Sequence, residues 1–316
     1  MTPSMRPPSR TESPVPATAG IGLKGPHCAQ IVDGLRHPEG VFKKTGVLAP
    51  VSWFEVHSEN YMGAGGPPHR YLEAIRRDYP LSVHGVGLSL GSAQGLDEGH
   101  LARVKAVVDR YQPGLVSEHL SWSIADKIYL NDLAPLPYTA EALDTICANV
   151  ARMQDTLGRT VLIENPSTYL QFGHSEMSEP EFVATMVRRT GCKVLFDVNN
   201  VYVSAVNHTV EPDLFLTQYL DALDPECIRE IHLAGHHVTA FESRPLLIDD
   251  HGSAVCPKVW EMYRETLHRT GPVATLIERD CNIPELAVLC AEAAKAADIL
   301  GRAGRRVKEQ ADAHAV

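Results

Sequence analysis

The chain has 316 residues, of which 44% are hydrophobic and 22% charged, so it is long enough to bury a large globular core. Its formal net charge of −10 predicts an acidic surface, which disfavours nucleic acid as a partner. No apolar run reaches the roughly 18 residues of a membrane span. The seven cysteines are scattered without a CxxC pair, which argues against a disulfide framework or thiolate zinc site and favours a reducing cytoplasm.

Residues 1–19 open the chain and are rich in Pro, Ser and Thr. They lack the hydrophobic core of a signal peptide, so we expect a disordered N-terminal tail.

Eight short apolar runs follow, and they predict buried strands. They lie at 21–23, 53–57, 81–84, 115–119, 161–165, 194–200, 228–232 and 274–278. From the second to the eighth, each run offers His, Asp or Glu at its carboxyl end.

Helical patterns alternate with these runs. In 98–111, for example, Leu101, Val104 and Val108 recur on one face. The other predicted helices are 140–157, 179–189, 212–223, 257–269 and 284–300, and three of them open with proline. Ser178 is the expected N-cap of the helix at 179.

Alternating strands and helices predict a parallel sheet, and eight strands predict its closure into a (β/α)8 TIM barrel, whose site lies at the carboxyl ends of the strands. One catalytic domain is expected over residues 20–303, followed by a fraying C-terminal tail at 304–316. Two connections, 58–69 and 233–255, are longer than usual and are expected to shape the site or bind a partner.

Histidines and carboxylates at the strand ends are the candidate site. His57 and His84 end consecutive strands, and neutral imidazole suits zinc, iron or copper. Glu118, Glu164 and Glu278 lie in otherwise apolar strands, where an ionised carboxylate needs a counter-charge. A buried ion pair is the alternative, but Arg279 is the one basic residue close to these strand ends, so metal cations are the more natural partners.

Further ligand types follow the sixth and seventh strands. Asp197 and Asn200 lie after the sixth strand, and His232 ends the seventh, with His236 and His237 close behind. Asp249 and His251 are expected on the same side of an extended segment. His100, His268 and His314 are expected at the surface. The candidates outnumber the ligands of one ion, and nitrogen and oxygen donors suit iron, manganese or zinc, so two or three metals are expected.

Several motifs resemble those of the multinuclear non-heme iron-dependent oxidative enzymes (MNIO), which include the methanobactin-biosynthesis oxidase. They are Gly20-Ile21-Gly22-Leu23-Lys24 with His27, Glu55-Val56-His57-Ser58-Glu59-Asn60-Tyr61, Ser82-Val83-His84-Gly85-Val86-Gly87, Ser117-Glu118-His119-Leu120, Glu164-Asn165-Pro166, Phe196-Asp197-Val198-Asn199-Asn200, Ile231-His232-Leu233-Ala234-Gly235-His236 and Ile277-Glu278-Arg279-Asp280. The overall pattern is most similar to the bufferin-type branch, found beside small copper-binding peptides.

The resemblance implies a xylose-isomerase-like TIM barrel that uses two or three irons, Fe(II) and Fe(III), with dioxygen as co-substrate. Its substrate would be cysteine in a ribosomally synthesised precursor peptide (RiPP), often delivered by a partner protein, with no nucleic acid or membrane involved. The implied metal ligands are His57, His84, Glu118, Glu164, Asp197, Asn200, His232, Asp249, His251 and Glu278, with Glu118 or Glu164 bridging. Asp280, His27 and His236 are implied as acid–base or supporting groups, alongside Asn165 and His237.

Three other functions fit the same pattern. A zinc phosphodiesterase of the endonuclease type predicts a basic groove, which the acidic charge disfavours, and a histidine where Asn200 stands. A sugar isomerase predicts oxygen-independent turnover with manganese or magnesium. A metal-binding scaffold predicts binding of a peptide without any change in its mass.

Overall fold

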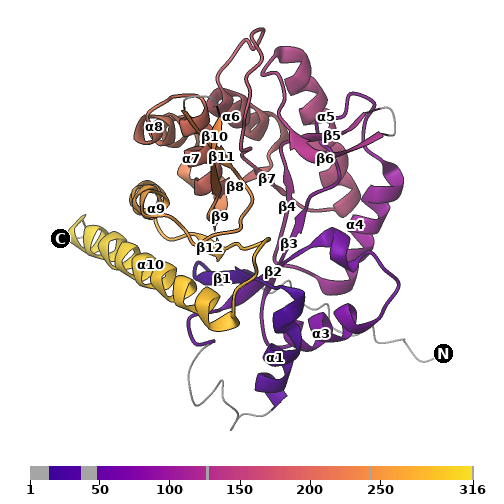
Figure 1. Cartoon of the computed structure of the whole chain (residues 1–316), viewed down its shortest axis with the longest axis vertical. Helices are drawn as coiled ribbons and strands as arrows, with labels where there is room; N and C mark the ends of the chain where they lie inside the picture. Colours follow the sequence, from indigo (N-terminus) through magenta and orange to yellow (C-terminus); the bar gives the residue numbers. More distant parts are fainter. Residues whose placement is uncertain (1–13, 37–47, 126–127, 242–243, 315–316) are drawn as a thin grey trace.

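The eight apolar runs form one closed barrel of parallel strands (Figure 1). The structure, a computed structural model, describes residues 14–36, 48–125, 128–241 and 244–314. The barrel strands are β1 (Ala19–Gly22), β2 (Trp53–His57), β3 (Leu81–Gly85), β4 (Leu115–His119), β7 (Leu162–Glu164), β8 (Lys193–Asp197), β9 (Ile228–Leu233) and β12 (Ala274–Ile277). They are hydrogen-bonded in the order β1-β12-β9-β8-β7-β4-β3-β2, so the predicted TIM barrel is confirmed.

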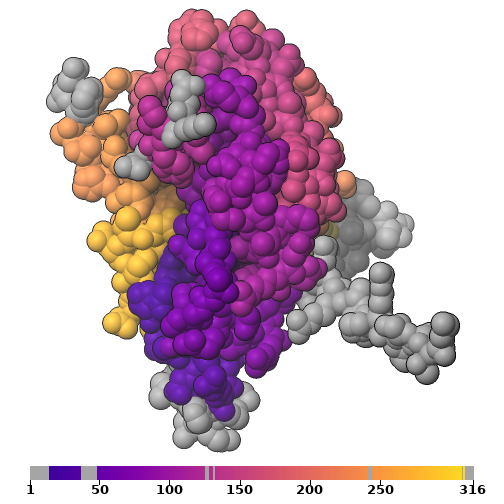
Figure 2. Space-filling model, turned by 90° about the vertical axis from the view of Figure 1, so that its right-hand side faces the viewer, coloured from indigo at the N-terminus to yellow at the C-terminus, as the bar shows by residue number. Residues whose placement is uncertain are grey.

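Helices surround the barrel, because parallel strands need crossover connections (Figure 1). They are α1 (Gly25–Arg36), α3 (Pro67–Arg76), α4 (Glu98–Tyr111), α5 (Ala140–Leu157), α6 (Glu179–Thr190), α7 (Val198–Asn207), α8 (Pro212–Ala222), α9 (Pro257–Thr270) and α10 (Leu286–His314). Ser178 caps α6 as predicted, by accepting a hydrogen bond from the Glu181 amide. Figure 2 shows a face that the first half of the chain, indigo to magenta, largely covers.

Three local predictions need correction. The helix α10 continues through His314, whereas the sequence placed a tail from residue 304; alanine and arginine, both strong helix formers, recur in this segment. Asn199 and Asn200 lie in the first turn of α7, not in an extended segment. His100 is buried, with its Nε2 3.3 Å from Glu59 Oε1, because the 58–61 segment folds against α4. The expected N-terminal tail lies mostly outside the described residues.

Additional elements lie between the barrel strands and the helices. The 3-10 turn η1 (Ser58–Tyr61) follows β2, and the 3-10 turn η2 (Pro225–Cys227) precedes β9. Two antiparallel hairpins pair β5 (Trp122–Ala125) with β6 (Ile128–Ala134) and β10 (His237–Phe241) with β11 (Arg244–Ile248). The second hairpin occupies the long connection predicted at 233–255. Both hairpins follow the carboxyl end of a barrel strand, the end at which TIM-barrel sites form.

Candidate metal centre

Alternate residues near the strand ends share one face, as the two-residue period of a strand requires. On β2 these are Glu55 and His57, and on β9 they are Glu230 and His232. The register aligns His57 with His84 and Asp197 with His232. Strands from opposite sides of the barrel therefore present ligand-type side chains to a common interior.

His84, His119 and Glu164 converge on one side of this interior. His84 Nε2 lies 3.1 Å and His119 Nδ1 lies 2.9 Å from the same Glu164 oxygen, Oε2. The two imidazole Nε2 atoms are 3.0 Å apart. His84 Nδ1 is 2.8 Å from the Ser117 hydroxyl, which orients the ring. Two imidazoles that point at one carboxylate oxygen are arranged as ligands of a shared ion.

His232 occupies the middle of the cluster and is fully buried. Its Nε2 lies 3.3 Å from Glu55 Oε1 and 4.0 Å from Glu230 Oε1, and its Nδ1 lies 2.9 Å from Glu278 Oε2. The Ser82 hydroxyl donates to Glu230 at 3.1 Å. This one imidazole therefore connects carboxylates from three barrel strands or strand ends.

His251 joins the loop after β11 to the loop after β12. Its Nε2 lies 2.8 Å from Asp249 Oδ1, and its Nδ1 lies 3.0 Å from Asp280 Oδ2 and 3.5 Å from Glu278 Oε2. The predicted proximity of Asp249 and His251 is present, but not through an extended backbone. His251 has φ 48°, a left-handed conformation that is costly for a residue with a side chain and that often occurs at functional sites.

Five overlapping groups of three residues have ligand atoms within 4.8 Å of one another among the described residues. They are His84-His119-Glu164, Glu55-Glu230-His232, His57-Glu278-Asp280, Glu164-Asp197-His232 and Asp197-His251-Glu278. Glu164, Asp197, His232 and Glu278 each belong to two groups, so neighbouring ions could share them. The donors are imidazole nitrogens and carboxylate oxygens, the set expected for iron, manganese or zinc.

The hydrogen bonding of these atoms is that expected of metal ligands. Glu164 Oε2, Asp197 Oδ2 and Glu278 Oε2 are buried and lack a hydrogen bond within the described chain. The same holds for Glu55 Oε2, Glu230 Oε1, Asn200 Oδ1, His251 Nε2 and both ring nitrogens of His232. Buried polar atoms are normally paired. Short separations without hydrogen-bond geometry are what ligands around an ion display, so the donor set fits a multinuclear metal centre.

The pKa values of His232 and Asp197 reflect the concentration of buried carboxyl groups in the cluster. Burial lowers the pKa of His232, but the Glu55 and Glu278 carboxylates outweigh it and raise that pKa well above its usual value. Burial, with the Glu164 and Asp249 charges, raises the pKa of Asp197 well above its usual value. Burial and the neighbouring charges therefore favour the protonated forms of His232 and Asp197, and metal binding would displace those protons.

The predicted ligand Glu118 lies apart from the cluster. Glu118 lies between Ser117 and His119 on β4, so its side chain lies on the opposite face of the strand from theirs. There its Oε2 packs against Gly85, where a Cβ atom would clash with it. Burial and the Glu59 charge raise its pKa to about 8. Glu164, the other predicted bridging residue, belongs to two ligand groups.

Asn165, directly after β7, and Asn200, in the first turn of α7, support the cluster. Asn200 Nδ2 donates to Glu164 Oε1 at 3.1 Å, which leaves Oδ1 as its possible ligand atom. Asn165 donates to the Asp197 carbonyl at 2.9 Å and accepts from the Asp197 amide at 2.8 Å. Asp197 also caps α7 by accepting from the Asn200 amide at 2.7 Å. These bonds hold the Asp197 carboxylate in place.

The three predicted acid–base residues lie at different depths. Asp280 forms an ion pair with Lys24 and contacts His251. His236 Nδ1 lies 2.8 Å from Asn199 Oδ1, and Asn199 donates to Asp249 at 2.8 Å, so His236 is linked to the cluster through two residues. His27 Nε2 lies 2.8 Å from the Pro284 carbonyl, outside the ligand groups.

Sequence reasoning missed Glu55, Glu230, His119 and Lys24. The signal for the first three was strand alternation, because each lies two residues from a histidine or serine that faces the interior. Lys24 lies in the loop after β1, and no sequence spacing indicated that it would pair with Asp280. Arg279, by contrast, pairs with Glu292 of α10 at 3.1 Å, so it does not neutralise the cluster.

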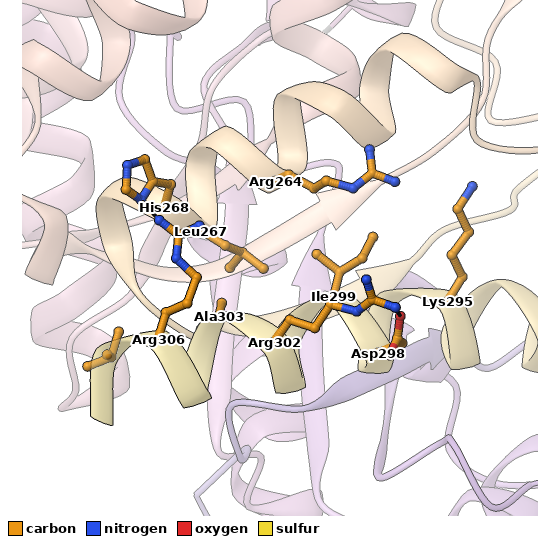
Figure 3. Close-up of a pocket in the computed structure, with 10 residues that line it drawn as sticks. Arg264, Leu267, His268, Lys295, Asp298, Ile299, Arg302, Ala303 and Arg306 are labelled. Carbon is orange, nitrogen blue, oxygen red and sulfur yellow. Dashed lines mark hydrogen bonds and ion pairs between the residues drawn. The ribbon is translucent and has the colours of Figure 1, made fainter. Parts of the chain in front are cut away.

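A pocket of about 440 Å³ on the outside of the barrel contains none of these ligands. It lies between α9 and α10, where Arg264, Arg302 and Arg306 surround Leu267 and Ile299 (Figure 3). Its aliphatic and cationic lining does not resemble a metal site.

Fold and site together define a (β/α)8 barrel with a candidate multinuclear metal centre at the carboxyl ends of its strands. A sequence model of the RiPP precursor modification enzymes MbnB/TglH/ChrH matches residues 18–301, and the chain belongs to this family. The family predicted from the sequence, the MNIO enzymes, is therefore confirmed.

A UPF0276 protein of Chromobacterium violaceum is 48% identical over 292 residues, covering 92% of this chain and 98% of that protein. A UPF0276 protein of Caulobacter vibrioides is 47% identical over 294 residues, covering 93% and 98%.

Solved structures of low identity share the fold. Endonuclease IV from Thermus thermophilus aligns with a TM-score of 0.57 at 17% identity, covering 88% of this chain and 98% of that one. L-ribulose 3-epimerase aligns with a TM-score of 0.57 at 13% identity, covering 95% and 99%. A xylose isomerase-like TIM barrel protein from Mycobacterium smegmatis aligns with a TM-score of 0.55 at 11% identity, covering 88% and 90%. These likenesses confirm the xylose-isomerase-like architecture. Within the described residues, no helix is long and apolar enough to cross a bilayer.

Proposed function

We propose that this protein uses two or three iron ions and dioxygen to oxidise cysteine residues of a ribosomally synthesised precursor peptide. The observation that carries the proposal is the overlap of five ligand groups at the barrel mouth, in a chain of a precursor-modifying family. The substrate that we favour is a small copper-binding peptide of the bufferin type, delivered by a partner protein in the cytoplasm.

The proposed ligands come from seven consecutive strand ends and their loops. They are His57, His84, His119, Glu164, Asp197, Asn200, His232, Asp249, His251 and Glu278, with Glu55 and Glu230 as further carboxylates. Glu118 remains a ligand predicted by the sequence alone. Bound iron would supply redox chemistry and would lower the pKa of a substrate thiol. None of the chain's seven cysteines belongs to a ligand group, so a thiol ligand would have to come from the peptide.

The surrounding residues would orient these ligands and hold protons. Lys24 neutralises part of the carboxylate charge through Asp280. Burial opposes protonation of Lys24, but Asp280 and Glu278 outweigh it and raise its pKa. The pair His236 and Asn199 fixes Asp249 and therefore the His251 ring. We propose Asp280 and His236 as the acid–base groups at the rim, with His27 supporting the loop before α10.

The test combines metal analysis with peptide mass spectrometry. Protein purified without oxygen and loaded with iron-57 should hold two or three irons per chain, partly coupled in its Mössbauer spectrum. A synthetic cysteine-containing peptide of the bufferin type should change mass in air and should keep its mass without oxygen. His84→Ala should lose metal and activity, while His268→Ala, at an exposed position on α9, should keep both.

Other outcomes would point to the rival functions. Stoichiometric zinc, with no activity gained on iron loading, would support a hydrolase of the endonuclease type. Turnover without oxygen would support an isomerase, and stoichiometric peptide binding without a mass change would support a scaffold.

A further inference from the structure

The β10–β11 hairpin connects two parts of the candidate metal centre. His236, which precedes β10, is linked through Asn199 to Asp249, which follows β11. The register pairs His237 with Ile248 at the base of the hairpin. The base therefore adjoins the centre, and β10 runs away from it.

The outer edge of β11 is already occupied. The Asn207 carboxamide on α7 donates to the Leu247 carbonyl at 3.0 Å and accepts from the Leu247 amide at 2.9 Å. It thus takes the place of a neighbouring strand. Pro245, two residues earlier, has no amide hydrogen to offer.

The same bonds fix which groups of β10 face outward. Both backbone groups of Leu247 point to Asn207, so its pair with Val238 is a non-hydrogen-bonded pair. The pair Ala240 and Pro245 lies two residues further along the hairpin, so it is a non-hydrogen-bonded pair as well. The amide and carbonyl groups of Val238 and Ala240 therefore point away from β11. Within the described residues, no backbone hydrogen bond reaches them from that side.

The free edge of β10 also lacks the usual protection. Val238 is 56% exposed, and His237 and Ala240 are exposed as well. The strand His237–Phe241 contains neither proline nor lysine, the residues that normally prevent strand addition at an edge. An exposed edge without Lys, Arg, Asp or Glu, and with two outward amide–carbonyl sets, is suited to an extended peptide.

We propose that an extended segment of the precursor peptide, N-terminal to the modified cysteine, pairs antiparallel with β10. This inference rests on the proposed function. Because β10 runs away from the metal centre, an antiparallel partner runs toward it. The residues that follow the paired segment, including the cysteine, are thereby directed to the metal ligands.

Hydrogen exchange tests the pairing without turnover. The probe is a synthetic cysteine-containing peptide of the bufferin type, added to iron-loaded protein without oxygen. The amides of Val238 and Ala240 should exchange rapidly in the free protein and slow about tenfold or more with the peptide. The amide of Thr239 faces β11, so it should be protected in both states. Uniform or absent protection at these alternate residues would overturn the proposal.

Proline substitution tests the same bonds kinetically. Val238→Pro removes an outward amide and breaks no bond within the hairpin, so it should raise KM about tenfold while kcat and iron content stay within twofold. Val238→Ala retains the amide and should change KM less than threefold. Ala240→Pro provides an independent repeat. If the proline variants misfold, peptides that are N-methylated at alternate residues test the same bonds. Methylation of the amides that face β10 should weaken binding, and methylation of the residues between them should not.

The outcomes separate docking from chemistry. Protection of Val238 and Ala240 without a mass change in air would uphold the docking and contradict the proposed function. A mass change with no protection and unchanged KM in Val238→Pro would contradict the docking alone. A wild-type dimer that Val238→Pro converts to monomer, without any effect on the peptide, would assign the edge to a second copy and overturn the proposal.

Discussion

Two sets of buried carboxyl groups in this barrel differ in what their oxygens contact. Glu179, at the start of α6, accepts from the Tyr138 hydroxyl at 2.6 Å and from the Tyr219 hydroxyl at 2.5 Å. Glu164 and Glu278 are equally buried, but one oxygen of each lacks a hydrogen bond within the described chain and faces imidazoles instead. Burial alone therefore does not distinguish the proposed ligands from other buried carboxyl groups, whereas an unsatisfied oxygen that faces imidazoles does.

The largest contrast should come from one substitution in each set. Glu278→Ala should abolish peptide oxidation and lower the metal content, because it removes a group shared by two ligand sets. Glu179→Gln should keep metal and activity and cost about 1–3 kcal/mol of the free energy of unfolding, because one phenol hydroxyl loses its acceptor. Metal analysis, peptide mass spectrometry and urea unfolding measure both variants. Full metal and activity in Glu278→Ala would refute the ligand assignment.

Removal of the metal should destabilise the cluster and leave the Glu179 site unaffected. A ligand at about 100 times its Kd adds about 2.7 kcal/mol, which corresponds to roughly 5–10 °C in Tm for a domain of this size. Iron-loaded wild type and Glu179→Gln should both show this increment over chelator-treated protein in calorimetry. Glu278→Ala should show less of it. Equal Tm values with and without iron in wild type would contradict a buried metal centre.

The sequence predicted the barrel more fully than the site. The strands are continuous apolar runs and the helices have clear periodicity and caps, so local pattern was sufficient. At the site, Asp197 and His232 could be predicted because they end strands. Lys24 and Asp280 come from loops after different strands, and only closure of the barrel brings them together. Glu179 carried no local signal, because both of its tyrosine partners are distant in sequence.

Neighbouring glutamates on adjacent strands offer a finer contrast. Glu164→Gln should lower metal affinity by about 10–100-fold, since His84 and His119 lose their common carboxylate partner. Glu118→Gln should retain the metal. Burial raises the pKa of Glu118 to about 8, so the wild-type group is largely neutral at pH 7, as glutamine is. Titration with iron(II) under anaerobic conditions measures both affinities, and equal losses of affinity in the two variants would support Glu118 as a metal ligand.

A further contrast is a pH dependence that belongs to Glu179. Burial raises the pKa of its carboxyl from 4.5 to about 7, against the opposing effect of the Tyr138 and Tyr219 hydroxyls. The folded state therefore binds the proton more tightly than the unfolded state. This contribution to stability is fully present below pH 4.5 and is lost as the pH rises through 7. Urea unfolding of chelator-treated protein should show a loss of about 1 kcal/mol per pH unit in this window for wild type relative to Glu179→Gln. If the free energy of unfolding had the same pH dependence in the two proteins, the Glu179 carboxyl would already be ionised in the folded state. The distinction between the two sets of carboxyl groups would then rest on hydrogen bonding alone.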